Sequence, residues 1–261
     1  MRQNRLRQLL QEDAPSLGTR VNSPWPSVIE LAAQSGMYDY VEFLGEYAPY
    51  TAHDLDNLAR AADVHNIDLM IKVEAESRGY LAQRAVGSGF QSVLFADCRS
   101  VEDAQECIRS VRPDTPEDRG TFGSVARRFT YMGYGGKDYA QMLRDIVVVL
   151  MIEKKGAVEQ LDAILELPGL DMIQWGGSDY SMSVGRLGDR GAPEVAKAQE
   201  RVFSSAIAAG IPPRAEIGSP GDAKRWLDIG VRHFSLGVDL AVLRSWWTRN
   251  GDEMRKALEG K

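Results

Sequence analysis

The sequence predicts a single (β/α)8 barrel over residues 1–261, an α/β fold in which eight parallel strands alternate with helices. Three observations predict this fold. Short apolar runs alternate with amphipathic helical patterns along the whole chain, which is typical of a parallel sheet. The strand-like runs number eight. No linker or change of composition divides the 261 residues, and eight units in a chain of this length favour a barrel over a doubly wound sheet.

The expected strands are short runs rich in aliphatic and aromatic residues, as buried strands usually are. In chain order they lie at residues 17–21, 38–44, 67–73, 91–96, 147–152, 171–175, 214–217 and 233–237. The run at 147–152, Val-Val-Val-Leu-Met-Ile, is apolar at every position. This pattern indicates a fully buried parallel strand.

The segments between these runs carry helical periodicity. They lie at residues 26–34, 53–65, 78–86, 101–111, 157–167, 194–209 and 221–229. Ser27 and Glu30 have capping-box spacing, which supports a helix start at this point. Five glycines stand where a helix ends before a strand, a position that favours left-handed backbone: Gly36, Gly89, Gly169, Gly210 and Gly230.

Two segments fall outside this alternation. Residues 112–137 form a long irregular stretch with two prolines and several glycines, and a loop of this length is usually a lid or a binding loop. Residues 240–261 predict a helix that carries Trp246 and Trp247. These two side chains either pack in the core or contact another subunit, and both alternatives stay open.

Composition and charge disfavour several kinds of partner. The chain has 31 Lys and Arg against 37 Asp and Glu, a net charge of −6, which disfavours nucleic acid and anionic membranes. No apolar run approaches the length of a membrane span. Residues 1–12 predict a short amphipathic helix rather than a secretory signal. With only Cys98 and Cys107 present, we expect reduced thiols in a cytoplasmic protein.

Two carboxylates follow strands at the end of the barrel where functional groups gather. Glu153 follows the strand at 147–152, and Asp179 follows the strand at 171–175 after two glycines and a serine. Such a pair forms a hard, oxygen-rich pocket suited to Mg²⁺ or Mn²⁺. The small residues before Asp179 let backbone N–H groups approach a bound carboxylate, or they serve only a tight turn.

Other polar residues, most of them acids, stand at the ends of the remaining strands. They are Arg20, Glu46, Tyr47, Lys72, Glu74, Asp97, Glu216 and Asp239. Taken singly, each acid could be a solvated or salt-bridged loop residue, and Lys154 with Lys155 could simply neutralise Glu153. The excess of carboxylates over cations nevertheless predicts a metal-assisted enzyme.

The chain resembles the HpcH/HpaI aldolase family, which comprises metal-dependent class II pyruvate aldolases with a barrel fold, over nearly its whole length. The resemblance rests on Ile-Glu-x-x-x-Ala-Val around Glu153, on Gly-Leu-Asp-Met-Ile-x-x-Gly-x-Ser-Asp at 169–179, and on Arg-Gly at 119–120. It also includes Gly-Glu-x-Ala-Pro at 45–49, Gly185, and Gly-Val-Asp-Leu at 237–240.

This resemblance implies that Glu153 and Asp179 hold Mg²⁺, Mn²⁺ or Co²⁺, and that the metal binds pyruvate and stabilises its enolate. A 2-oxo acid and an aldehyde would be the small-molecule partners. We expect Gly177, Ser178, Asp179 and Arg119 to bind the substrate. The resemblance also implies a homo-oligomer, a hexamer or trimer of dimers, with the C-terminal helix packed on a neighbouring subunit.

The sequence departs from the family at its acid/base residues. The family's segment reads Asp-x-Glu-His, whereas residues 44–47 read Leu-Gly-Glu-Tyr. Lys72 stands where the family has the arginine that polarises the keto oxygen. Tyrosine has an unperturbed pKa near 10 against about 6.5 for histidine, so Tyr47 is a poor base at neutral pH. Lys72 lacks the bidentate fork of arginine.

We therefore expect a metal-dependent carbon–carbon lyase, an aldolase that cleaves or forms 2-oxo acids through a pyruvate-type enolate. Lys72 would stabilise the enolate oxygen, with Tyr47 and Glu46 handling protons or substrate hydroxyls. One alternative is decarboxylation or acyl condensation of an oxaloacetate-like acid, which needs no histidine base. Another is a non-catalytic barrel that acts as a binding or assembly partner, because the Asp–His pair is absent.

Overall fold

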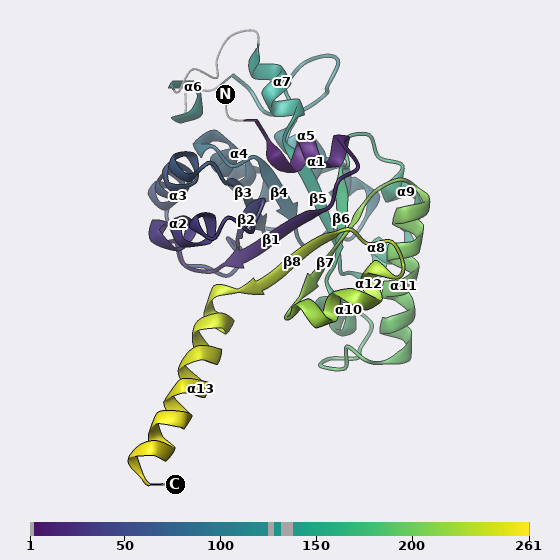
Figure 1. Ribbon diagram of the computed structural model, residues 1–261. Coiled ribbons are helices and arrows are strands. Elements are labelled where there is room, and N and C mark those ends of the chain that lie inside the picture. The colour runs from purple at the N-terminus through teal and green to yellow at the C-terminus, as the bar shows by residue number, and fades with distance from the viewer. Residues whose placement is uncertain (1–2, 125–127, 132–137, 261) are drawn as a thin grey trace.

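The computed structural model describes residues 3–124, 128–131 and 138–260. Eight parallel strands close into one barrel in chain order, and the last pairs back to the first (Figure 1). The predicted (β/α)8 fold is therefore confirmed. The strands are β1 (Ser16–Val21), β2 (Tyr40–Phe43), β3 (Asp68–Val73), β4 (Ser92–Phe95), β5 (Val147–Ile152), β6 (Met172–Trp175), β7 (Pro213–Ile217) and β8 (His233–Val238).

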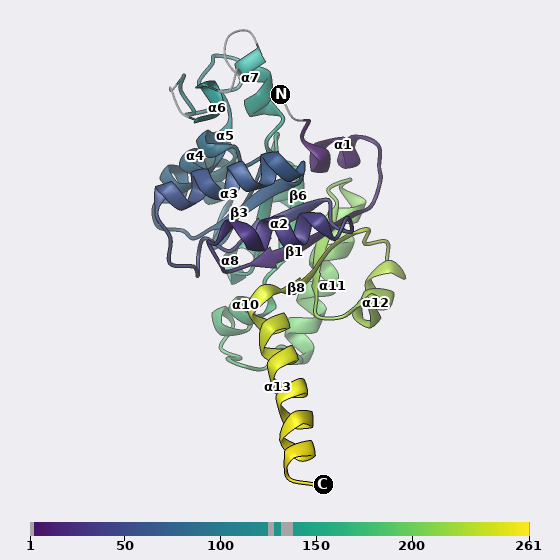
Figure 2. The same ribbon diagram turned by 60° about the vertical axis from the view of Figure 1, so that its left-hand side comes forward.

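Helices lie between the strands and cover the outside of the barrel (Figures 1 and 2). In chain order the described helices, including α1 before the first strand and α13 after the last, are α1 (Arg5–Gln11), α2 (Pro26–Gln34), α3 (Ala52–His65), α4 (Arg78–Ser88), α5 (Val101–Val111), α6 (Arg128–Tyr131), α7 (Tyr139–Arg144), α8 (Lys155–Glu159), α9 (Leu161–Leu165), α10 (Gly177–Ser183), α11 (Pro193–Ala208), α12 (Lys224–Leu227) and α13 (Asp239–Leu258). The five glycines predicted to end helices all have a positive φ angle.

Some helices differ from the prediction. The helix expected at 157–167 is split into α8 and α9 at Gln160, whose side chain accepts a hydrogen bond from Val101 N–H and so favours the break. The helix expected at 221–229 begins as a 3₁₀ turn, η2 (Pro220–Ala223), before α12. No capping box forms at Ser27, because α2 begins at Pro26 and Ser27 already lies inside it.

The long segment at 112–137 is described only in part, because residues 125–127 and 132–137 lie outside the described residues. The described part follows α5 and contains a bridge between Pro113 and Phe122. Connections from a helix to the next strand lie at the amino-terminal end of a barrel. These residues are therefore at the end opposite to the carboxyl ends of the strands.

The amino-terminal helix α1 closes that same end of the barrel (Figure 1). Leu6 is fully buried and packs with Tyr40, Met70 and Leu94, whose side chains point into the barrel. Burying one leucine side chain in this way stabilises the fold by about 1.5–3 kcal/mol. The Asn4 side chain fixes α1 in this position by donating hydrogen bonds to the backbone carbonyls of Gln91 and Asp145, which lie just before β4 and β5.

The C-terminal helix α13 leaves the barrel after β8 and extends away from it (Figure 2). None of its residues is buried, and Trp246 and Trp247 are 56% and 62% exposed. Within this chain the two tryptophans therefore do not pack in the core. Among the described helices, none, including α13, combines the length and the apolar character needed to cross a membrane.

The barrel interior changes from apolar near α1 to polar towards the other end. Glu42 on β2 and Arg214 on β7 form an ion pair there, and both side chains are completely buried. The guanidinium of Arg214 also lies 5.4 Å from the centre of the Tyr40 ring. Since neither charge reaches water, each depends on the other for neutralisation.

Replacing Glu42 by glutamine should lower the free energy of unfolding by about 3–5 kcal/mol, because Arg214 would stay buried without its counter-charge. Urea denaturation of the two proteins in one buffer measures this difference. Glu117→Gln is the matched control, since Glu117 pairs with Arg144 at the surface and should leave the midpoint nearly unchanged. Equal stability of wild type and Glu42→Gln would contradict the role given to this pair.

Candidate active site

A cavity of about 570 Å³ opens at the carboxyl-terminal ends of the strands. Strands β1, β3, β5, β6 and β7 or the turns after them supply most of its lining. The structure brings six predicted site residues to this cavity: Tyr47, Lys72, Glu153, Gly177, Ser178 and Asp179. Glu46 joins them through its ion pair with Lys72.

Glu153 is the buried acid of the pocket, with 2% of its surface exposed. Side chains of β5 alternate between the two faces of the sheet, and Val147, Val149 and Met151 point into the barrel. Glu153 continues this inward series. Its Oε1 accepts a hydrogen bond from Asp97 N–H at 2.7 Å. Burial raises the pKa of Glu153 to about 7, against the lowering effect of that hydrogen bond and of the Lys72 charge.

Gly176 allows the chain after β6 to pass directly beside Glu153. A Cβ atom on Gly176 would lie 2.4 Å from Glu153 Oε2 and 2.5 Å from Glu153 Cβ. The φ angle of Gly176 is −109°, so the glycine is required for space rather than for a left-handed turn. Any side chain at this position would displace the buried acid.

Asp179 belongs to the same charged group, and its charge contributes to the raised pKa of Glu153. Lys154 Nζ lies 3.0 Å from Asp179 Oδ1 and 2.6 Å from Asp97 Oδ1. Lys155 points elsewhere and pairs with Glu159 on the surface. Lys154 therefore pairs with two other acids instead of bonding directly to Glu153.

Lys72 is the buried cation of the pocket, 4% exposed. Its Nζ lies 2.5 Å from Glu46 Oε2 and donates a hydrogen bond to Tyr47 OH at 2.7 Å. Burial alone would lower the pKa of Lys72, but the hydrogen bonds and charges of Glu46 and Tyr47 raise it. Lys72 is thus protonated at neutral pH, which disfavours a Schiff base. Burial raises the pKa of Tyr47 to about 12, so Tyr47 keeps its proton as well.

The far side of the pocket contains Arg20 and Glu216, which the sequence interpretation placed at strand ends, and beside them three residues that it missed, Gln174, Arg190 and Arg225. Arg20 pairs with Glu216 at 2.5 Å, and Gln174 donates a hydrogen bond to the same carboxylate. Arg190 and Arg225 line the outer part and are exposed. Both arginines come from segments that follow strand ends by many residues, so only the folded barrel brings them to the pocket.

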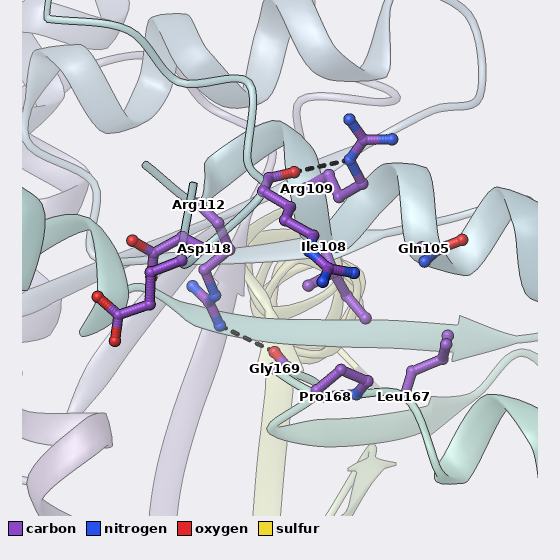
Figure 3. A pocket seen from close by; sticks show the side chains of 10 residues that line it. Gln105, Ile108, Arg109, Arg112, Asp118, Leu167, Pro168 and Gly169 are labelled. Carbon is purple, nitrogen blue, oxygen red and sulfur yellow. Dashed lines mark hydrogen bonds between the residues drawn. The ribbon is translucent and has the colours of Figure 1, made fainter. Parts of the chain in front are cut away.

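Arg119 lies elsewhere. It lines a separate cavity of about 600 Å³ formed by the end of α5 and the turn at 167–169 before β6 (Figure 3). The side chain of Arg112 crosses this cavity to the carbonyl of Gly169, 2.8 Å away. Both segments precede strands, so this cavity is at the amino-terminal end of the barrel. The structure does not bring Arg119 to the strand-end pocket, and we leave it out of the proposed site.

The acids of the pocket suit a cation, but they do not form a complete cage. Among the described residues, no group of three or more His, Cys, Asp or Glu side chains is arranged to hold a metal ion. A divalent ion on Glu153 and Asp179 would therefore take its remaining ligands from water or substrate oxygens. Burial raises the pKa of Glu153 more than the charges of Lys72 and Lys154 lower it, and a cation bound directly to the carboxylate would favour its ionised form.

These features define an enzyme barrel, with a polar pocket at the carboxyl ends of its strands for a small molecule. The model of the HpcH/HpaI aldolase/citrate lyase family matches residues 19–245. The chain belongs to this family. The predicted resemblance is therefore confirmed, and the protein is a lyase-type enzyme rather than a non-catalytic barrel.

Individual relatives agree with this assignment. The 5-keto-4-deoxy-D-glucarate aldolase of Shigella boydii serotype 18 is 31% identical over 176 residues, which cover 67% of this chain and 68% of that protein. An HpcH/HpaI aldolase/citrate lyase family protein from Burkholderia cenocepacia J2315 has a TM-score of 0.87 at 26% identity, over 97% of this chain and all of that one. Citrate synthase SbnG shares the fold, with a TM-score of 0.87, 24% identity and coverage of 98% and 100%.

Proposed function

We propose that this protein is a metal-dependent carbon–carbon lyase that forms or cleaves a 2-oxo acid through a pyruvate-type enolate. The observation that carries this proposal is Glu153, an acid that is almost completely buried at a strand end beside a second acid. Burying a carboxylate without a counter-charge is costly. A pocket that keeps such a group is suited to bind a cation, and membership of the aldolase/citrate lyase family supports the lyase chemistry.

Glu153 and Asp179 would hold the metal ion, Mg²⁺, Mn²⁺ or Co²⁺. When bound, such an ion supplies Lewis-acid polarisation of a keto oxygen. Gly177, Ser178 and Asp179 carry the first three N–H groups of α10, and the first N–H with an acceptor inside this helix is that of Tyr180. These three amides would receive the substrate carboxylate.

Lys72 would stabilise the enolate oxygen, because the protein fixes its positive charge in a buried position. Tyr47 keeps its proton at neutral pH and would donate it or a hydrogen bond to the substrate. Glu46 would accept a proton or bind a substrate hydroxyl. A positioned acid/base contributes about 10²–10⁴-fold in rate, and the family's Asp–His pair is absent here.

Decarboxylation or acyl condensation of an oxaloacetate-like acid is the second candidate. The observation that favours it is Tyr47, whose pKa near 12 prevents it from acting as a base at neutral pH. In the decarboxylation, loss of carbon dioxide leaves the enolate directly, so that reaction needs no side chain to remove a proton from carbon. Lys72 would stabilise the same enolate in both candidates.

The assembly we propose is a homo-oligomer, a hexamer or trimer of dimers, with α13 packed on a neighbouring subunit. The helix has twenty residues and buries none of them within its own chain. Five of its exposed apolar residues recur at helical spacing along one stripe, which consists of Leu240, Leu243, Trp247, Met254 and Leu258, while Val242 and Trp246 are exposed outside it. An apolar stripe of this length is typical of a surface that contacts another protein.

Oxaloacetate turnover provides the test of the function. The wild type with Mg²⁺, Mn²⁺ or Co²⁺ should decarboxylate oxaloacetate faster than free metal does. Glu153→Gln should lower the rate about 100-fold or more, and chelation should do the same. Both changes remove the metal ion that polarises the keto oxygen of the substrate. Glu159→Gln on the exposed surface of α8 is the control and should keep the full rate. A Glu153→Gln protein that retains turnover would refute the proposed site.

Sedimentation velocity provides the test of the assembly. The wild type should sediment as an oligomer, and a Leu243→Glu/Trp247→Glu double variant should dissociate, because two carboxylates would have to be buried in the apolar stripe. Glu253→Gln leaves the stripe intact and serves as the control. A monomeric wild type at micromolar concentration would show that α13 does not mediate association.

A further inference from the structure

Lys154 lies between two acids, Asp179 in the pocket lining and Asp97 beside the pocket. Its Nζ is 2.6 Å from Asp97 Oδ1 and 3.0 Å from Asp179 Oδ1, and its side chain is only 17% exposed. The three groups come from successive strand ends: Asp97 follows β4, Lys154 follows β5, and Asp179 lies in α10 after β6. A lysine at this position is a cation built into the protein beside a carboxylate proposed to hold a metal.

Asp97 holds this lysine in place. Its side chain pairs with Lys154, while its backbone N–H bonds to Glu153 Oε1 at 2.7 Å. The same residue therefore anchors both the buried acid and the internal cation. If Lys154 released Asp179, it would still keep its ion pair with Asp97, so its positive charge would stay near the metal site.

We propose that Lys154 competes with the divalent metal ion for Asp179, and that this chain therefore binds metal more weakly than the same barrel without the lysine. The inference rests on the proposed function, since it requires metal binding at Glu153 and Asp179. The physical cause is repulsion between an ammonium group and a divalent ion a few ångströms apart. Dissolved salt screens this repulsion only weakly, because the distance between the two charges is shorter than the Debye length.

Lys155 offers a matched control, because it is the next residue and carries the same charge. It pairs with Glu159 on α8, and both side chains are 62% exposed. Its positive charge is screened by water, so its removal should not change metal affinity. A comparison of the two lysines separates a local contact with Asp179 from the general effect of losing one positive charge.

Calorimetric titration of Mn²⁺ into metal-free protein tests the inference without measuring turnover. Lys154→Met and Lys154→Gln should each bind Mn²⁺ at least about tenfold more tightly than the wild type, and Lys155→Met should match the wild type. Circular dichroism melts of all four proteins establish that the variants fold. Two replacements at residue 154 separate the effect of charge from the effect of one particular side chain.

The outcomes distinguish this inference from the proposed function. If wild type binds Mn²⁺, Glu153→Gln does not, and neither Lys154 variant gains affinity, Lys154 is not a competitor and only this inference fails. If neither the wild type nor the Lys154 variants bind Mn²⁺ at millimolar concentration, the metal-dependent function and the inference fail together. Tighter binding in both Lys154 variants, with Lys155→Met unchanged, would support the competition.

Discussion

The cost of burying charge governs the carboxyl-terminal end of this barrel. An ionised side chain that leaves water must find a partner or give up its charge. Most charged side chains in and beneath the pocket form ion pairs. These pairs are Lys72 with Glu46, Arg20 with Glu216, Arg214 with Glu42, and Lys154 with Asp97 and Asp179. Among the described residues, no cation lies within ion-pair distance of Glu153. Glu153 is thus a buried acid without a direct ion-pair partner, which the proposed metal ion would supply.

Local structure explains how that acid reaches the pocket. The two-residue period of β5 directs Glu153 inwards, after three apolar residues that fill the barrel. Gly176 leaves room for the carboxylate, and the Asp97 N–H fixes one of its oxygens. At the opposite end α1 closes the barrel with an apolar plug. The fold therefore excludes water at one end and gathers charge at the other.

Much of this could be predicted from the sequence, because the signals are local. Apolar runs mark the strands, and a polar residue at or shortly after the end of a run marks a candidate site residue, which is how the sequence predicts Lys72, Glu153 and Asp179. Contacts between distant segments leave no such signal: Gln160 breaks a predicted helix by bonding to Val101. The ion pairs of Lys154 with acids after two neighbouring strands likewise depend on the closed barrel. So does the location of Arg119 at the amino-terminal end of the barrel.

Binding of oxalate is the most direct measurement of the central claim, that Glu153 and its neighbours form a metal-dependent enolate site. Oxalate resembles the pyruvate enolate in shape and charge, and mimics of reactive species bind more tightly than substrates. Calorimetry should show oxalate binding to wild type with Mg²⁺ or Mn²⁺, and none after chelation or in Glu153→Gln. Oxalate binding by the chelated protein or by Glu153→Gln that is as tight as binding by the metal-loaded wild type would contradict the claim.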